Sequence, residues 1–196
     1  MIKKSDLKLI KTTDPVLLTP PKLFDFEGEI GGDMLANIML DRMKELGGVG
    51  LSANQVGLNI RMFVMGAGDK NYAIFNPEII ETSNEIISGD EGCLSFPGIY
   101  VKVVRPKSVY ARYKNARGEE QVEEFTGLTA RVFLHEYDHM EGKTFKDRVS
   151  KLKWDLAHNR MIKRTKKIIK RGVQKQLLDI ANKIKDNNVD DSSRIS

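Results

Sequence analysis

The sequence predicts an α+β protein in which antiparallel strands, gathered in the middle of the chain, surround a central helix that carries the segment HEYDH. From Arg61 to about Glu124 the chain consists of short segments rich in β-branched or aromatic residues, separated by Gly, Pro and Asn, which is typical of strands and turns. The intervals between these segments are too short for crossover helices, so the strands should pair antiparallel. Apolar residues at helical spacing occur on both sides of this region.

Three helices are expected, one before the strands and two after them. The first has Gly47 or Gly48 as its C-cap, and its apolar positions follow helical spacing: Met34, Leu35, Ile38, Met39, Met43 and Leu46. The second runs from about Gly127 to Met140. The third is a long basic helix from Lys151 to about Lys185, with a possible break near Gly172.

The remaining segments are irregular or turn-forming. Residues 12–28 contain three prolines and should form an extended lead-in without regular structure. Residues 113–122, with Asn and Gly at their centre, should form a β-hairpin. Residues 186–196 are polar and are expected to be a disordered tail.

Length and composition indicate a globular chain with a single main domain. The 196 residues include 40% hydrophobic and 30% charged residues, which is enough to bury a core without disulfides. The single cysteine cannot form an internal disulfide, and this favours a reducing compartment. The N-terminus lacks the apolar run of a signal peptide, and no stretch approaches a membrane span. We therefore expect a cytoplasmic protein that does not bind a membrane.

Charge divides the chain into two parts. Residues 1–150 hold 19 Lys and Arg against 22 Asp and Glu, whereas residues 151–196 hold 13 against 5. We expect residues 1–150 to be the main domain and residues 151–185 to be a basic helical extension. Such an extension fits an anionic partner, with RNA the first candidate, although a solvated helix face would have the same composition.

The segment HEYDH points to metal chemistry. On a helix, positions four apart share a face, so His135 and His139 can direct their imidazoles at one ion. Glu136 lies beside them, as in the H-E-x-x-H pattern of metal-dependent hydrolases, where the glutamate is the general base. The alternative is a helix that carries two unrelated histidines.

A catalytic metal site usually has three protein ligands, so one more is needed. Glu141 is too near in sequence to reach the same ion, and His158 lies alone in the basic helix, where it is expected at the surface. Cys93 is the remaining soft donor, although a lone cysteine is often a small buried apolar residue. Its neighbours Gly89, Gly92, Pro97 and Gly98 make a turn-rich segment that would let the backbone approach a site closely.

Three segments, taken together, resemble the signature segments of the peptide deformylase family. They are GVGLSANQVG at residues 48–57, EGCLS at residues 91–95 and HEYDH at residues 135–139, and they occur in the family's order. The likeness covers about three quarters of the chain, and the α+β layout agrees with the family's fold. Two departures are Ser52 and Asn54 in the first segment and Leu134 before the first histidine, and neither changes a proposed ligand.

The resemblance implies a reaction and a site. The reaction is hydrolysis of the N-formyl group from the N-terminal formylmethionine of nascent polypeptides, with release of formate. The metal ligands would be Cys93, His135 and His139. The family is associated with Fe²⁺, and Zn²⁺, Ni²⁺ or Co²⁺ can take the same place. Glu136 would act on the metal-activated water as general base and then as general acid.

The resemblance also assigns donors for the oxyanion that forms during hydrolysis. These are the side-chain amide of Gln55 and the backbone N–H of Leu94. The side-chain NH₂ of glutamine suits this role because it donates without adding charge. On local sequence alone, Gln55 could equally be a turn residue in a glycine-rich loop.

Further residues are expected around the substrate. Gly50, beside Val49, would let the backbone run close to the peptide. Leu128 and Val132 lie on roughly the helix face of His135 and could line an apolar methionine pocket, or they could be ordinary core residues. Glu91 is expected to orient a neighbouring ligand.

Two other functions compete with the deformylase interpretation. One is a metallopeptidase of the H-E-x-x-H type that cleaves internal peptide bonds, which would not need EGCLS at a fixed place. The other is a non-enzymatic RNA-binding protein that uses its basic helix. In some bacterial deformylases the C-terminal helix docks on the ribosome, so the ribosome or its RNA is an expected partner besides the formylated nascent peptide. No DNA partner is expected.

Overall fold

The computed structural model describes residues 3–67 and 70–192. The chain divides into two units, Met1–Trp154 and Asp155–Ser196. The elements of the first unit are, in chain order, η1 Lys4–Asp6, α1 Pro15–Leu18, α2 Gly32–Glu45, β1 Gly50–Ser52, η2 Ala53–Val56, β2 Met62–Ala67, β3 Lys70–Thr82, β4 Ile86–Cys93, β5 Phe96–Pro106, β6 Ser108–Lys114, β7 Glu120–Thr126, α3 Gly127–Met140 and η3 Phe145–Arg148. The last helix, α4, spans Lys151–Ser192 and begins within this unit.

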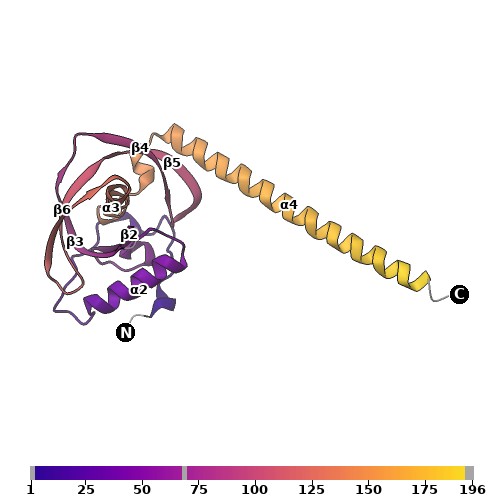
Figure 1. Cartoon of the computed structure of the whole chain (residues 1–196), viewed down its shortest axis with the longest axis horizontal. Helices are drawn as coiled ribbons and strands as arrows, with labels where there is room; N and C mark the ends of the chain where they lie inside the picture. Colours follow the sequence, from indigo (N-terminus) through magenta and orange to yellow (C-terminus); the bar gives the residue numbers. More distant parts are fainter. Residues whose placement is uncertain (1–2, 68–69, 193–196) are drawn as a thin grey trace. The chain divides into compact units, whose positions relative to one another are not determined.

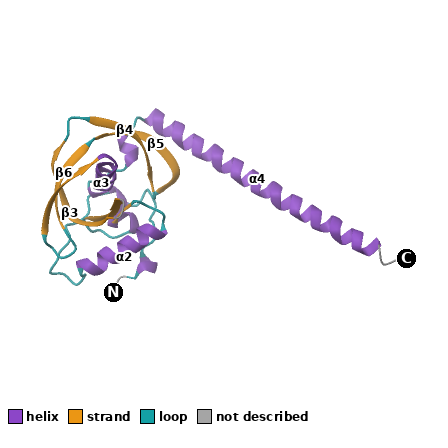
Figure 2. Cartoon of the chain, viewed as in Figure 1, coloured by secondary structure: helices purple, strands orange, loops and turns teal. Residues whose placement is uncertain are grey.

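Two antiparallel sheets form the body of the first unit. One sheet has five strands in the order β1-β2-β3-β6-β7, and the other is the two-stranded ribbon β4-β5. Both sheets lie around helix α3 (Figures 1 and 2), as the sequence predicts. The expected hairpin is the β6-β7 connection, where Gly118 adopts a left-handed φ of 81° and Ser108 to Lys114 pair with Thr126 to Glu120.

Helix α3 is buried because most of its faces meet a sheet or the ribbon. One apolar cluster joins its residues Phe133, Leu134 and Met140 to strands β2, β3, β6 and β7. Phe133 stacks on Phe125 of β7, with ring centroids 4.9 Å apart. A helix surrounded in this way presents polar side chains to the interior, and those side chains must find partners there.

A second apolar cluster lies under helix α2 and contains Leu35, Met39 and Met43, which were predicted from their spacing. Gly47, with φ of 68°, follows the end of α2 in the left-handed conformation that commonly ends a helix. The prediction of this helix and its C-terminal stop is therefore confirmed, and strand β1 begins two residues after Gly48.

Three local expectations differ from the structure. The lead-in contains one turn of helix, α1, because Asp14 caps it through a hydrogen bond from the backbone N–H of Val16 and Pro15 suits the first helical position. Helix α4 is not broken at Gly172, since a single glycine weakens a helix by only about 1 kcal/mol. It also continues through residues 186–192, where no proline or glycine interrupts it, whereas residues 193–196 of the predicted tail lie outside the described residues.

Candidate metal centre and active site

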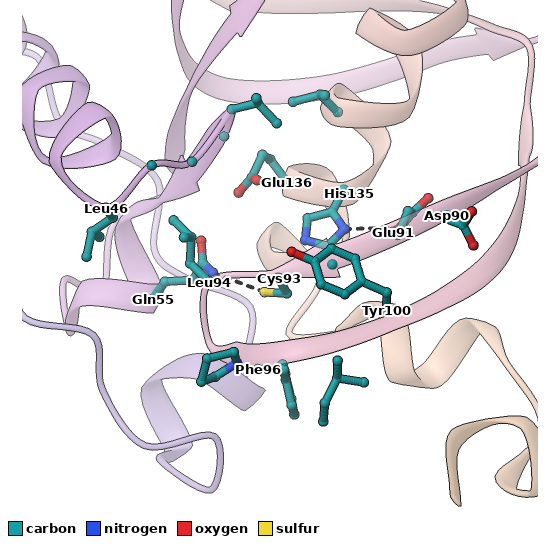
Figure 3. A pocket seen from close by; sticks show the side chains of 18 of the residues that line it. Leu46, Gln55, Asp90, Glu91, Cys93, Leu94, Phe96, Tyr100, His135 and Glu136 are labelled. Atoms are coloured by element: carbon teal, nitrogen blue, oxygen red, sulfur yellow. Dashed lines mark hydrogen bonds and ion pairs between the residues drawn. The ribbon is translucent and has the colours of Figure 1, made fainter. Parts of the chain in front are cut away.

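A cavity of about 460 Å³ opens between β1, the turn that joins β4 to β5, and one face of α3 (Figure 3). It brings together residues that are far apart in the sequence. The predicted residues that line it are Val49, Gly50, Gln55, Glu91, Cys93, Leu94, Leu128, Val132, His135 and Glu136. His139 is fully buried and reaches the same site from deeper in α3.

Three soft or borderline donors meet at the base of this cavity. Cys93 ends strand β4, and His135 and His139 lie one helical turn apart on α3. One donor atom from each of the three lies within 4.8 Å of the others, and the Sγ of Cys93 is 3.5 Å from the Nε2 of His139. Metal–sulfur and metal–nitrogen bonds are about 2.3 Å and about 2.1 Å long. The donor set therefore fits one ion.

The orientation of His135 is fixed from behind by Glu91. The Nδ1 of His135 lies 3.1 Å from the Oε2 of Glu91, so the opposite ring nitrogen faces the site. Glu91 also accepts hydrogen bonds from Arg105 and Arg131, at 2.8 Å and 2.7 Å. Burial alone would raise the pKa of Glu91, but the hydrogen bonds from Arg105 and His135 lower it to about 2. Glu91 is therefore an anionic hydrogen-bond partner of His135.

The same network continues to the other end of α3. Arg105, which is 2% exposed, joins Glu91 to Asp138 by a hydrogen bond of 2.7 Å from its Nη1. Asp138 also accepts from the Nε of Arg148, at 3.0 Å. Sequence reasoning missed Arg105, Arg131 and Arg148, because only the tertiary fold brings these arginines to the two carboxylates.

The buried histidines differ in their electrostatics. Burial and the positive charges of His135 and Arg105 hold the pKa of His139 well below its usual range, so its ring is neutral, as a ligand must be. Burial opposes charge on His135 too, but hydrogen bonds to Cys93 and Glu91 raise its pKa to about 10. The space between the thiol and this carboxylate therefore favours positive charge, which is what a bound cation would supply.

Glu136 projects into the cavity from α3, next to the ligand histidine (Figure 3). Burial is the main cause that raises its pKa to about 7, and the nearby Glu91 and Asp138 add to the effect. Its Oε2 is one of the buried side-chain atoms without a hydrogen-bond partner among the described residues. Its other oxygen lies against the backbone of Gly50, where a Cβ atom would overlap the carboxylate. The sequence suggested that glycine at position 50 lets the backbone run close to the substrate. In the structure, the group that a larger residue at this position would meet is the Glu136 carboxylate.

Gln55 is held in one orientation on the opposite side of the cavity. Its Oε1 accepts hydrogen bonds from the backbone N–H and the hydroxyl of Ser52, at 3.0 Å and 3.1 Å. Its Nε2 therefore faces inward and donates to the Sγ of Cys93, at 3.2 Å, and to the hydroxyl of Ser95, at 3.0 Å. Local sequence alone allowed Gln55 to be only a turn residue. In the structure its side-chain amide is also held in place beside Cys93.

The mouth of the cavity is apolar and open. Val49 and Leu128 are 63% and 76% exposed, which excludes the alternative that Leu128 is a core residue. Val132 is partly buried deeper on the same face of α3, and Tyr100 of β5, which sequence reasoning missed, is 64% exposed at the rim. Exposed apolar residues around a concave site are suited to contact a ligand with apolar side chains.

The two rejected ligand candidates lie outside this group of donors. Glu141 pairs with the Nη2 of Arg61, at 2.8 Å, and His158 is an exposed residue of α4. The only cluster of His, Cys, Asp and Glu with metal-binding spacing among the described residues is Cys93, His135 and His139. Within the same part of the chain, no helix combines the length and apolarity needed to cross a bilayer.

A family model described as polypeptide deformylase matches residues 7–155 of the chain. The chain belongs to the peptide deformylase family. It is a peptide deformylase, a hydrolase with a Cys/His/His metal site, and formylated nascent peptides are the substrates that the family implies. The matched region ends next to Trp154, so most of α4 lies outside it.

Individual relatives agree with this assignment. The deformylase is 47% identical over 124 residues to a peptide deformylase of Thermotoga neapolitana, covering 63% of this chain and 76% of that protein. It is 41% identical over 152 residues to peptide deformylase 1B, chloroplastic/mitochondrial, of Arabidopsis thaliana, covering 75% of this chain and 55% of that protein. The crystal structure of peptide deformylase from Thermotoga maritima matches with a TM-score of 0.70 and 41% identity, over 74% of this chain and 97% of that one.

Proposed function

We propose that Cys93, His135 and His139 hold one divalent ion in this deformylase, and that Fe²⁺ occupies the site in the cell, with Zn²⁺, Ni²⁺ or Co²⁺ able to replace it. The observation that supports the proposal is the convergence of these three donors within 4.8 Å at the base of an open cavity. A thiolate and two neutral imidazoles suit both Fe²⁺ and Zn²⁺, and a catalytic site keeps one position free for water. When bound, the ion supplies Lewis acidity that makes a water molecule a nucleophile near neutral pH.

Glu136 is the proton carrier of the proposed reaction. Its buried carboxylate points into the cavity beside His135, and its Oε2 has no protein partner among the described residues, so it is free to accept a proton from water. The same carboxyl then delivers that proton to the departing amine of methionine. A positioned general base of this kind typically contributes about 10²–10⁴-fold to the rate.

Gln55 and Leu94 are the proposed donors to the formyl oxygen as it becomes negative. The Nε2 of Gln55 is aimed inward by the two hydrogen bonds from Ser52, so its orientation is set before substrate arrives. The N–H of Leu94 lies in the adjacent turn between β4 and β5, which also lines the cavity. Such pre-oriented donors stabilise the transition state without a reorganisation cost during the reaction.

The methionine side chain of the substrate fits the apolar wall formed by Leu128 and Val132, with Val49 and Gly50 along the peptide. The support for this arrangement is that all four residues line the cavity, with Val49 and Leu128 exposed at its mouth. Glu91 takes no direct part in this proposal. It orients His135, and its negative charge is balanced by ion pairs with Arg105 and Arg131.

The test is formate release from formyl-Met-Ala by protein purified without oxygen, with metal analysis of the same sample. Glu136→Gln should keep the metal and lose about 10²–10⁴-fold in kcat. Cys93→Ser should lose the metal and the activity together. A metallopeptidase that uses a carboxylate as third ligand would keep both after the Cys93 substitution. Absence of formate release by the metal-loaded wild type would overturn the proposal.

We also propose that the basic helix α4 binds the ribosome through its RNA, in the cytoplasm. Its support is charge: residues 151–196 hold 13 Lys and Arg against 5 Asp and Glu, and the basic side chains between residues 163 and 171 are exposed. The test variant replaces Lys163, Lys166, Lys167 and Lys170 by Gln, and it should co-sediment less with ribosomes. The slope of log binding constant against log salt concentration should also become shallower, by about 0.7–0.9 for each phosphate that the helix no longer neutralises. Binding that is unchanged at every salt concentration would exclude the role.

A further inference from the structure

The metal centre is built from two separate parts of the fold. Cys93 ends strand β4, whereas His135 and His139 belong to helix α3. Only a precise placement of the β4-β5 turn against α3 keeps the Sγ of Cys93 at 3.5 Å from the Nε2 of His139. The residues that fix this placement therefore influence the metal centre without supplying a ligand atom.

Across the turn, Cys93 is paired with Phe96, the first residue of β5. The Phe96 ring is edge-to-face with Phe145 and with Trp154, at centroid separations of 5.5 Å and 5.4 Å. Phe145 and Trp154 are also edge-to-face, at 5.7 Å. Each of the three rings therefore contacts the other two, in the edge-to-face geometry that aromatic pairs prefer.

The other side of this aromatic cluster reaches helix α3. Phe145 is 1% exposed, and its ring centroid lies 5.8 Å from that of the ligand histidine, His135. Phe96, the partner of Cys93, thus connects through Phe145 to the ring of His135, and Trp154, which contacts both phenylalanines, completes this bridge of three rings. Trp154 closes this bridge from the first turn of α4, and the Nζ of Lys146 lies 5.5 Å from its ring centroid.

The segment that supplies two of these rings also contacts α3 at a second point. The connector, defined as residues 145–154, includes Arg148, whose Nε donates to the Oδ2 of Asp138 at 3.0 Å. Asp138 is 1% exposed and directly precedes His139. The connector packs against both β4 and β5 through η3. It therefore touches the cysteine side and the histidine side of the metal centre.

We infer that the connector fixes the Cys93 turn against helix α3, and that Trp154 is the positioning residue at its end. The first turn of α4 is then part of the catalytic unit, and a chain cut after Ser150 lacks one ring of the bridge. This inference rests on the proposed metal centre, because it assigns Trp154 a role in holding the three ligands together. Removing the outer groups that position a ligand typically lowers metal affinity about 10–100-fold.

The experiment compares full-length Trp154→Ala, Trp154→Leu and Trp154→Phe with wild type, all loaded with Co²⁺. Metal release into excess chelator gives the dissociation rate, and the thiolate–cobalt absorption band reports the Cys93 contact. We expect dissociation about 10-fold faster in Trp154→Ala and Trp154→Leu, with a weakened band, because both remove the edge-to-face packing. Trp154→Phe keeps a ring and should restore most of the wild-type rate.

The matched control is Leu152→Ala, on the same helical turn, where the side chain is 69% exposed. It should release metal at the wild-type rate. Measurements are made well below the melting temperature of each variant, so that global unfolding does not contribute. If one variant does not fold, the others still decide the question.

Two failures are distinguishable. Wild-type dissociation rates in every folded variant that lacks the ring, with wild type active, would overturn the inference and leave the proposed function standing. A wild-type protein that neither retains Co²⁺ nor releases formate would instead overturn the proposed function.

Discussion

The carboxylate of Glu136 lies in the space that any side chain at position 50 would need. A Cβ atom built on Gly50 overlaps the Oε1 of Glu136 and comes within 2.8 Å of its Cδ. The glycine of strand β1 therefore sets how far the proposed general base reaches into the cavity. The glycine-rich segment and HEYDH are related by this contact as well as by their order in the sequence.

The first prediction follows from that contact. Gly50→Ala should push the Glu136 carboxylate away from its position and lower kcat for formyl-Met-Ala by about 100-fold, since a misplacement of about 1 Å can cost this much. The three metal ligands are untouched, so metal content should not change. Gly31→Ala is the control, because nothing lies within 4 Å of its added Cβ. Wild-type kcat in Gly50→Ala would show that this contact does not position the base.

The second prediction concerns the buried arginine between the two carboxylates. Arg105→Met should lower the free energy of unfolding by about 3–5 kcal/mol, because it leaves Glu91 and Asp138 buried with fewer partners. Urea denaturation measures the change. Lys102→Met removes an ion pair whose side chains are 70% and 65% exposed, and it should change stability by less than about 1 kcal/mol. Equal effects in the two variants would contradict a structural role for the buried network.

The third prediction links metal binding to stability. An ion that binds the folded protein alone stabilises it by about 2.7 kcal/mol at a free concentration 100 times Kd. Titration with Ni²⁺ should therefore raise the melting temperature of the chelator-treated wild type. Cys93→Ala removes one of the three donors and should show a much smaller rise at the same concentrations. An equal rise in both proteins would place the stabilising ion elsewhere.

The fourth prediction is a pH dependence away from the site. Burial alone would raise the pKa of Glu123, but hydrogen bonds from Lys70, Tyr72 and Tyr113 lower it below its usual range. A carboxyl with a lowered folded-state pKa stabilises the protein above its unfolded-state value, about 4.3, and loses this contribution as the pH falls through the folded-state pKa. Glu123→Gln should therefore be less stable than wild type by about 1 kcal/mol at pH 7.

The difference between wild type and Glu123→Gln should shrink as the pH falls below about 4.3. Urea denaturation of the metal-free proteins at several pH values measures it. Glu120→Gln serves as the control, since that side chain is 63% exposed and lies 3.7 Å from its partner Arg112. A difference that stays constant down to acidic pH would contradict the sign of the shift.

Local sequence determined the helices and strands and most of the chemistry. Helical spacing placed Leu35, Met39 and Met43 in the core, and the i, i+4 rule placed His135 and His139 on one face of α3. The resemblance of three segments to the peptide deformylase family implied that Cys93 is the third donor. The helical features were predictable because periodicity depends on residues that are close together in the chain.

Only the tertiary structure decided which distant groups support the site. The arginines at positions 105, 131 and 148 carry no local signal, and they gain partners because α3 is enclosed by the sheets and its buried carboxylates must be paired. The same holds for Gly50, whose neighbour proved to be Glu136, and for Trp154, whose ring meets that of Phe96 from a distant part of the sequence. Contacts of this kind depend on how the elements pack in space, and no local pattern along the chain shows which distant residues will meet.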